Sequence, residues 1–316
     1  GFLLFDYRAL KDIAIFLVVF SILLLLVTKC IYLINGHSWY KPARWLSLGP
    51  FGFQTSDIAR FSIIIYMAYY VDRKREKLES IQNGLIPALF VLFLIMSLII
   101  IQPDYSTAIM IGFIGIIILF IGGAKLSQLS LTCSCALLIC IPVLFSREYR
   151  RQRVLSFFGV GDNPDVGYQA HQSLISLGNG GLLGTGLGNS IEKNHFLPTP
   201  HTDFIFAIIG EELGFMLGTV PVITLFLLIF FQGIKIAKNC NDPFGVFLSV
   251  GIVSNFILYA FVNASVVTGL LPVTGLPMPL VSYGGSGMIV NMSLIGILLN
   301  ISQGKRVVGD KHWNLK

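Results

Sequence analysis

Residues Leu197–Phe215 read LPTPHTDFIFAIIGEELGF and join a loop to the beginning of an apolar helix. Two prolines break the loop, which carries His201 and Asp203, and the helix that follows is apolar except for Glu211 and Glu212. With a rise of 1.5 Å per residue, the two glutamates lie roughly 12 to 14 Å beyond Asp203. Carboxylates at that depth in a membrane are costly, so we expect each to have a hydrogen-bond donor or a cavity. Asp203, at the mouth of the helix, is the acid that a substrate can reach.

The composition of the whole chain is that of a membrane protein. Of its 316 residues 54% are hydrophobic and 12% are charged, and the mean hydropathy is +0.78. These values exclude an ordinary soluble domain. The net charge is +6, but the basic residues lie in short clusters between apolar runs, so we expect no nucleic-acid partner. The five cysteines show no CxxC spacing and no nearby ligand set, and we predict neither a disulfide nor a cysteine metal site.

Eight apolar runs are long enough to cross a bilayer, which takes about 20 residues per helix. We therefore predict an all-α fold, a polytopic helical bundle that forms one membrane domain over residues 1–316. The chain shows no repeat and no inverted halves, so a secondary transporter built from repeats is not supported. Because it starts at Gly1 without Met or a signal-peptide pattern, we expect a native N-terminal part to be absent. The eight runs are 12–34, 56–72, 84–101, 105–123, 127–145, 204–232, 243–266 and 285–302.

The basic residues predict the orientation of this bundle. Most of them lie at the two ends of the chain and in the links 72–77, 122–127 and 234–242, which can all share one face. The positive-inside rule places this face, with both termini and the tail 303–316, in the cytoplasm. The outer face then carries a long loop at about 146–203. It also carries the apolar segment 271–279, whose three prolines forbid a continuous helix and make it a candidate re-entrant loop.

Polar and charged residues at the starts of helices lie mainly on the outer face. Ser56 is a plausible N-cap of the second span, and Asp57 and Arg60 lie on one face of that helix. The alternatives are a capped helix with a local ion pair, or charges that face the interior of the bundle or water. Asp104 likewise begins a helix after a short turn. The basic cluster 147–153 favours an anionic partner, although a belt of snorkelling arginines at a helix end is the alternative.

Small residues mark two further segments. The tract Gly178–Asn189 reads GNGGLLGTGLGN, without the Gly-Lys-Ser/Thr of a phosphate loop and without a preceding strand, so no nucleotide cofactor is expected. Its glycines allow the backbone to approach a ligand or another helix closely. Ala207, Gly210 and Gly214 form a stripe on the same side of their helix as Asp203, which also permits close helix contact.

Five segments of the chain resemble the SEDS family, the FtsW/RodA type of bacterial cell-wall polymerases. They are ARWLSLGPFGFQTSD, QPDYST, GYQAHQSLISLGNGGLLGTGLGNSIEKNHFLP, HTDFIFAIIGEELGF and LPVTGLPMPLVSYGGS. They occur in order, at fitting spacing, and cover nearly the whole chain. The NSIEK and GEELG segments favour the division branch, FtsW, over the elongation branch, RodA.

The resemblance implies a bundle of ten helices, of which the first two would be missing here, in the bacterial cytoplasmic membrane. It implies an enzyme that polymerises lipid II, a disaccharide-pentapeptide on undecaprenyl pyrophosphate, outside that membrane. The implied partner is a class B penicillin-binding protein, the transpeptidase. The essential acid of the family falls on Asp203, the predicted catalytic residue. The candidate substrate-binding residues are Arg44, Asp57, Arg60, Asp104, Arg150, Arg153, His201 and Ser282.

The chain departs from the family pattern at three places. The usual Gln-Pro-Ser-Glu followed by Lys is Gln54–Asp57 with Arg60, which keeps the charges but changes their reach. The usual QPDLGT is Gln102–Thr107, with Tyr105 and Ser106. The Glu often found before HTD is Thr199, which argues against catalytic help from that position.

Glycosyl transfer needs a base for the attacking sugar 4-hydroxyl and stabilisation of the departing pyrophosphate. We predict Asp203 as the base and the outer arginines as the anion clamp, because a guanidinium binds phosphate oxygens bidentately. Pyrophosphate also binds Mg²⁺ or Mn²⁺, which Asp57, Asp104 and Asp203 could help to hold. The alternatives are a lipid II flippase or transporter, and a noncatalytic scaffold. A transporter needs a midplane site reachable from both sides, whereas the polar residues here lie at one face.

Overall fold

The computed structural model describes residues 6–35, 44–48, 51–145, 148–160, 164–194 and 196–310. The described residues form two compact units. Unit 1 comprises Gly1–Leu129, Ile229–Asn255 and Gly285–Lys316, and unit 2 comprises Ser130–Leu228 and Phe256–Gly284. The divisions fall inside three helices, α5, α9 and α10, so each of these contributes residues to both units.

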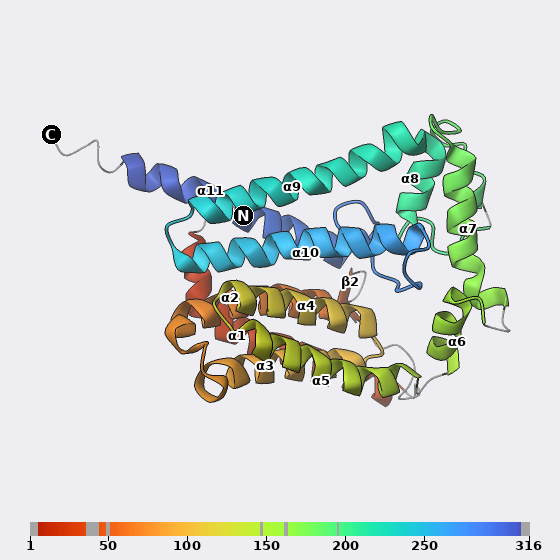
Figure 1. Ribbon diagram of the computed structural model, residues 1–316. Helices are drawn as coiled ribbons and strands as arrows, with labels where there is room; N and C mark the ends of the chain where they lie inside the picture. Colours follow the sequence, from red (N-terminus) through yellow and green to blue (C-terminus); the bar gives the residue numbers. More distant parts are fainter. Residues whose placement is uncertain are drawn as a thin grey trace. The chain divides into compact units, whose positions relative to one another are not determined.

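Each of the eight predicted apolar runs is helical (Figure 1). Among the described residues, five stretches are long and apolar enough to cross a membrane: Tyr7–Ile34, Ile81–Ile101, Ile205–Asn239, Pro243–Val267 and Gly285–Gly304. Two shorter apolar helices are Tyr105–Ile121 and Leu126–Leu138. The prediction of a mainly helical, multi-pass membrane protein is thus confirmed. The helices are α1 Leu10–Ile34, α2 Thr55–Lys74, α3 Ile86–Ile101, α4 Tyr105–Ile121, α5 Leu126–Phe145, α8 Ile205–Gly214, α9 Val220–Asn239, α10 Pro243–Val267 and α11 Gly285–Asp310.

The links contain structure that the sequence did not predict. An antiparallel hairpin, β1 Trp45–Leu48 and β2 Phe51–Gln54, precedes α2, with Trp45 opposite Gln54. It corrects the prediction of an all-α chain. The long loop contains two helices, α6 Glu148–Phe157 and α7 Pro164–Gly180. The remaining short turns are η1 Tyr7–Ala9, η2 Arg75–Lys77, η3 Ile81–Leu85, η4 Glu192–Asn194 and η5 Phe215–Thr219.

Unit 1 is built on α1 to α4, with α1 packed along α2 and α3 packed against α4. Its core is aliphatic and includes Ile63, Ile64 and Met67 of α2, all without solvent exposure. Gly115 of α4 faces Leu92 of α3 so closely that an added Cβ would lie 2.8 Å from the leucine. Small residues of this kind allow apolar helices to approach each other in a membrane.

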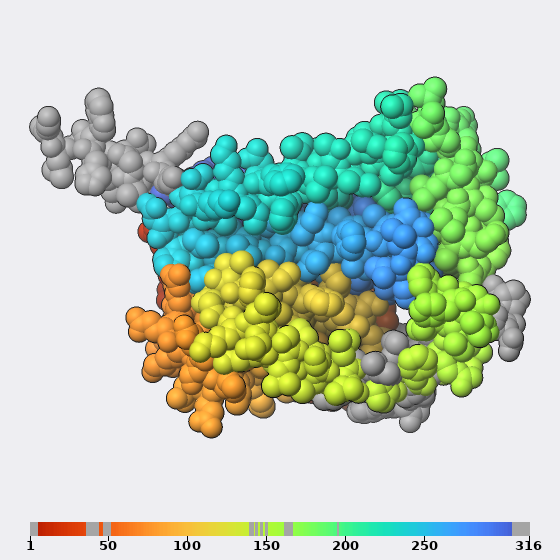
Figure 2. Space-filling view, viewed as in Figure 1, coloured from red at the N-terminus to blue at the C-terminus, as the bar shows by residue number. Residues whose placement is uncertain are grey.

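The basic links gather at one end of unit 1. The ammonium of Lys11 lies 3.0 Å from a carboxylate oxygen of Asp72 and 3.2 Å from one of Asp242. Lys125 pairs with Glu79 at 3.3 Å, so the link after α2 lies beside the start of α5, as Figure 2 also shows. These contacts confirm that the links share one face. A shared face is the geometric condition for assigning them all to one side of a membrane.

In unit 2, α7 packs along α8 and α6 packs on α7 (Figure 1). The contact between α7 and α8 runs along the predicted small-residue stripe. An added Cβ on Gly210 would collide with Leu177, and one on Gly180 would collide with the backbone of Gly210. The predicted close contact at the stripe and at the Gly-rich tract is therefore confirmed.

Candidate functional site

Asp203 lies in the turn directly before α8 and is half-buried. Its main chain is fixed by Asn263 of α10, whose Nδ2 donates to the carbonyl of Asp203 at 2.7 Å and to that of Leu276 at 2.8 Å. The N-cap of α8 is Phe204, and the hydroxyl of Thr202 donates to the carbonyl of Thr199 at 3.3 Å.

The Pro-rich segment before α11 passes directly over Asp203. The hydroxyl of Ser282 donates to the carbonyl of Thr202 at 2.6 Å and accepts from the amide of Met278 at 2.8 Å. The amide of Tyr283 donates to the carbonyl of His201 at 3.0 Å. Gly275 is so close that an added Cβ would lie 3.5 Å from Oδ2 of Asp203.

Three predicted site residues, His201, Asp203 and Ser282, therefore meet in unit 2. Ser282 is buried and its hydroxyl makes two hydrogen bonds within the loop, whereas the side chain of His201 is exposed. Asn263 was missed by the sequence reasoning. The signal that could have found it is an amide side chain within an apolar helix, where an unpaired polar group is costly.

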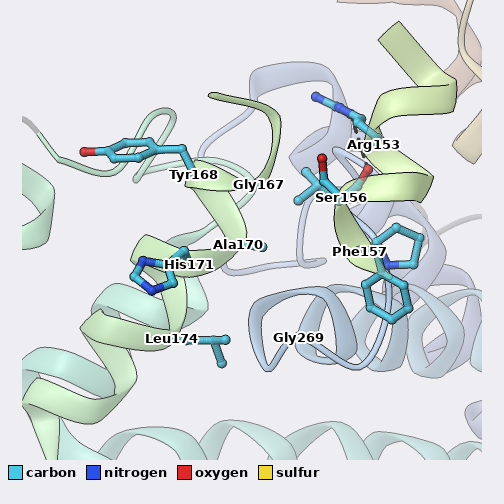
Figure 3. A pocket seen from close by; sticks show the side chains of 11 residues that line it. Arg153, Ser156, Phe157, Gly167, Tyr168, Ala170, His171, Leu174 and Gly269 are labelled. Carbon is cyan, nitrogen blue, oxygen red and sulfur yellow. Dashed lines mark hydrogen bonds between the residues drawn. The ribbon is translucent and has the colours of Figure 1, made fainter. Parts of the chain in front are cut away.

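A cavity of about 470 Å³ lies between α6, α7 and the segment 269–273 (Figure 3). Arg153 of the basic cluster lines it and donates from Nη1 to the carbonyl of Val273 at 3.3 Å. The hydroxyl of Ser156 is buried at this cavity without a hydrogen-bond partner among the described residues. Val273, in the wall of the cavity, precedes by two residues Gly275, which lies beside the carboxylate of Asp203. The side chain of Arg150 lies outside the described residues.

In unit 1, Asp57 and Arg60 form a buried ion pair at 3.1 Å. Two residues of α11 complete it. The hydroxyl of Ser286 donates to Asp57 at 3.1 Å, and Arg60 donates to the side-chain oxygen of Asn291 at 3.4 Å. The local ion pair, which the sequence left as one of two alternatives, is present, and it belongs to a larger polar cluster. The sequence reasoning missed Ser286 and Asn291.

Asp104 joins the same cluster from the start of α4. Its carboxylate accepts from the hydroxyl of Ser56 at 3.1 Å and from Nε2 of Gln54 at 3.2 Å. Arg44 lies 3.9 Å from the Asp104 carboxylate and donates to the carbonyl of Pro103. The predicted N-cap role of Ser56 is wrong, because its hydroxyl is used by Asp104 and the N-cap of α2 is Gln54. Two acids and two arginines thus balance in charge, and Arg44, at 35% side-chain exposure, is the more accessible arginine.

Glu211 and Glu212 bind residues 190–193, the segment that follows the Gly-rich tract, through hydrogen bonds and an ion pair. The Glu211 carboxylate is fully buried and accepts from the hydroxyls of Ser176 at 2.9 Å and Ser190 at 2.6 Å, and from the amide of Ile191 at 3.0 Å. Glu212 forms an ion pair with Lys193. The prediction that both glutamates have hydrogen-bond partners is confirmed.

Replacement by glutamine is predicted to change stability in opposite directions at Glu211 and at Glu192, which lies beside it. Glu211→Gln is expected to lower the free energy of unfolding by about 1 to 3 kcal/mol, because three donors point at a carboxylate and a glutamine offers only one acceptor oxygen. Glu192 is buried beside Glu211, and burial, with the charge of Glu211, raises its pKa. A raised acid pKa favours folding at low pH, and this contribution is lost as the pH rises through the raised value.

Glu192→Gln is therefore the matched control for Glu211→Gln. We expect it to be as stable as the wild type at low pH and more stable at higher pH. The measurement is reversible unfolding of both variants between about pH 4 and pH 8. Equal destabilisation by the two substitutions would contradict this description of the two glutamates.

Among the residues that the structure describes, no three His, Cys, Asp or Glu side chains are grouped so that they could hold a metal ion. Asp57 and Asp104 already accept from arginine, hydroxyl or amide donors. The described residues therefore do not form an all-protein cage for Mg²⁺ or Mn²⁺.

The sequence matches known proteins along most of its length. The family model described as "Cell cycle protein", for FtsW, RodA and SpoVE, matches residues 1–307. "Probable peptidoglycan glycosyltransferase FtsW" of Geobacter sulfurreducens is 38% identical over 298 residues, which are 94% of this chain and 79% of that protein. "Stage V sporulation protein E" of Bacillus subtilis is 37% identical over 263 residues, 83% of this chain and 72% of that protein.

Two solved structures share the fold. One, described as "Structural coordination of polymerization and crosslinking by a peptidoglycan synthase complex", has a TM-score of 0.76 at 24% identity and covers 96% of this chain and 84% of that chain. The other is the rod shape determining protein RodA of Thermus thermophilus, with a TM-score of 0.64 at 23% identity, covering 95% of this chain and 81% of that chain. At these identities the likeness establishes the fold alone. The family match and the identity to the curated relatives go further: this chain belongs to the FtsW, RodA and SpoVE family of cell cycle proteins.

Proposed function

We propose that this protein is a peptidoglycan glycosyltransferase that polymerises lipid II, with Asp203 as the general base. The names of its curated relatives support this activity. The observation that carries the assignment of the base is the placement of Asp203. It is a half-buried acid before α8, with its main chain held by Asn263 and the Pro-rich segment passing over it.

In the proposed step Asp203 accepts the proton of a sugar 4-hydroxyl. The hydroxyl oxygen then bonds to the anomeric carbon of a second lipid-linked sugar, and the bond from that carbon to the pyrophosphate oxygen breaks. Undecaprenyl pyrophosphate leaves with the bonding electron pair. A positioned base contributes about 10²- to 10⁴-fold to such a reaction.

The arginines divide into three proposed roles. Arg44 is partly exposed and suits direct contact with the pyrophosphate, whose oxygens a guanidinium binds bidentately. Arg60 is 2% exposed and paired with Asp57, so we assign it to positioning this cluster. Arg153, at the cavity beside the Pro-rich segment, is proposed with Arg150 and His201 to bind the sugar or peptide part of the substrate.

A divalent cation would bind here mainly through the substrate. Mg²⁺ is commonly held by one or two carboxylates together with substrate phosphates rather than by a protein cage. We propose that Mg²⁺ or Mn²⁺ enters on the pyrophosphate and contacts at most one of the acids Asp57, Asp104 and Asp203.

We further propose that eight helices of this chain span the bacterial cytoplasmic membrane with both ends in the cytoplasm. The gathering of the basic links at one end of unit 1 supports this orientation. The Pro-rich segment 271–279 is proposed as a re-entrant loop over Asp203. A class B penicillin-binding protein is the proposed partner, and cell division is the proposed setting.

The experiment is polymerisation of fluorescent lipid II by the purified protein in proteoliposomes, with and without a class B penicillin-binding protein. We expect glycan strands, resolved as a ladder on a gel. A purified protein that gives no strands in either condition, although it binds lipid II, would reject the enzyme in favour of a scaffold.

A further inference from the structure

The helix that follows Asp203 is interrupted at Gly214. α8 ends there, the π-helical turn η5 follows, and α9 begins at Val220. Gly214 has φ 78° and ψ −178°, a backbone conformation that is essentially restricted to glycine. In an uninterrupted α-helix the amides of Phe215 and Met216 would donate to the carbonyls of Glu211 and Glu212. An interruption within an apolar helix leaves such groups in need of other partners.

The Gly-rich tract supplies those partners. The amides of Phe215 and Met216 donate to the carbonyls of Gly181 and Leu182, at 2.9 and 3.1 Å. In the opposite direction, the amides of Thr185 and Gly186 donate to the carbonyls of Glu211 and Glu212, at 2.9 and 3.0 Å. Four hydrogen bonds therefore insert residues 181–186 into the helix break.

Glycine is needed on both sides of this insertion. An added Cβ on Gly184 would collide with the backbone of Glu212 and Leu213, and one on Gly214 would collide with the backbone of residues 182–184. Gly184 also has a φ of +83°, in the left-handed region that favours glycine. The sequences GLLG and GEELG are thus two halves of one contact.

The break lies at the edge of the predicted hydrocarbon layer. The apolar stretch Ile205–Asn239 has 35 residues, whereas about 20 residues of helix cross a hydrocarbon core about 30 Å thick. The stretch becomes polar at its far end with Gln232, Lys235 and Lys238. Counting back about 20 residues from Gln232 puts the other edge of the core near Leu213, next to the break.

The inserted tract presents large apolar side chains at this level. Leu182, Leu183 and Leu187 are 65%, 72% and 77% exposed. Phe215 and Met216, on the other side of the same hydrogen bonds, are also mostly exposed. Since these two belong to a stretch that is long and apolar enough to cross the membrane, the lipid that contacts them also reaches the tract bonded to them.

We propose that residues 181–187 form an interfacial membrane anchor, which closes the break in the helix and places Leu182, Leu183 and Leu187 among the acyl chains at the edge of the hydrocarbon core. Irregular backbone at this depth requires internal hydrogen bonds, and the four bonds to the helix supply them. Because the tract is bonded to α8, the anchor fixes the level of Asp203 relative to the lipid surface.

The experiment reads the depth of single tryptophans by fluorescence quenching. In the full chain the three native tryptophans are replaced by phenylalanine, and Leu183→Trp or Leu187→Trp is added. The proteins are reconstituted in phosphatidylcholine vesicles brominated either near the carboxyl end of the acyl chain or near its middle, and acrylamide serves as the aqueous quencher. The matched control is Val160→Trp, because Val160 follows α6 in the same unit and is 68% exposed.

We expect Leu183→Trp to be quenched by brominated lipid, more strongly by bromine near the carboxyl end than by bromine at mid-chain, and to be shielded from acrylamide. Val160→Trp is expected to be quenched strongly by acrylamide and weakly by either brominated lipid. Leu187→Trp gives the same test if Leu183→Trp does not fold. Acrylamide quenching as strong as at Val160, absence of quenching by either brominated lipid, or stronger quenching from mid-chain bromine would each overturn the anchor.

Discussion

Asp203→Asn is expected to fold like the wild type and to polymerise lipid II about 10²- to 10⁴-fold more slowly, which is the contribution of a general base. Asparagine has nearly the same shape as aspartate but accepts no proton. The contact with Asn263 uses the main-chain carbonyl of residue 203, which the substitution keeps. The loss is therefore expected in the rate and not in the stability.

The measurement is the rate of glycan formation from fluorescent lipid II, with the midpoint of thermal unfolding determined on the same preparations. Glu79→Gln is the matched control, since it removes a carboxylate that is 71% exposed and lies in another link. The control is expected to retain the wild-type rate. An Asp203→Asn variant that polymerises at close to the wild-type rate would remove Asp203 from the mechanism.

Arg60→Met is expected to lower the free energy of unfolding by about 3 to 5 kcal/mol, the usual cost of removing one partner of a buried ion pair. The reason is that Asp57 stays buried after its arginine is gone, with Ser286 as its remaining donor among the contacts described above. Methionine has a similar length and is apolar, so the loss reports the charge more than the volume. Polymerisation is also expected to fall, because the same cluster holds Asp104 and Arg44.

Reversible unfolding in mixed detergent micelles measures this loss. Lys125→Met is the matched control, because it breaks the exposed pair with Glu79 and should cost at most about 1 kcal/mol. The double variant Asp57→Asn with Arg60→Met is expected to recover part of the loss, since no buried charge is left unpaired. Equal losses of unfolding free energy from Arg60→Met and Lys125→Met would show that the buried ion pair stabilises the fold no more than the exposed pair does.

The sequence predicted the helices well because length and apolar composition are local properties. All eight predicted runs are helical, and the basic links do meet at one end of unit 1. The ion pair of Asp57 and Arg60 was also predictable, since a spacing of three residues places both on one helix face. The single-domain interpretation and the number of spans stay predictions.

The failures involve partners that are distant in the sequence. Ser56 was predicted as a cap from its position, but its hydroxyl bonds Asp104, 48 residues away. The break at Gly214 could not be predicted either, because glycine permits such a conformation without requiring it. Only the tract around Gly184, which meets the break in space, explains why the helix is interrupted there.

The predicted site residues form two groups in the structure. His201, Asp203 and Ser282 lie together in unit 2, and Arg44, Asp57, Arg60 and Asp104 lie together in unit 1. The residue types and motifs identified these members, but the donors that fix them, Asn263 and Ser286, come from α10 and α11. The substrate-binding roles of all these residues stay predictions.

The most direct measurement of the proposed reaction counts the undecaprenyl pyrophosphate that is released. Purified protein in proteoliposomes is given lipid II with no other glycosyltransferase present, and undecaprenyl pyrophosphate is quantified alongside new glycosidic bonds. An enzyme of the proposed kind releases one undecaprenyl pyrophosphate for each bond formed, and the Asp203→Asn variant releases almost none. Movement of lipid II across the bilayer with no undecaprenyl pyrophosphate released and no glycosidic bond formed would contradict the proposal and identify a flippase.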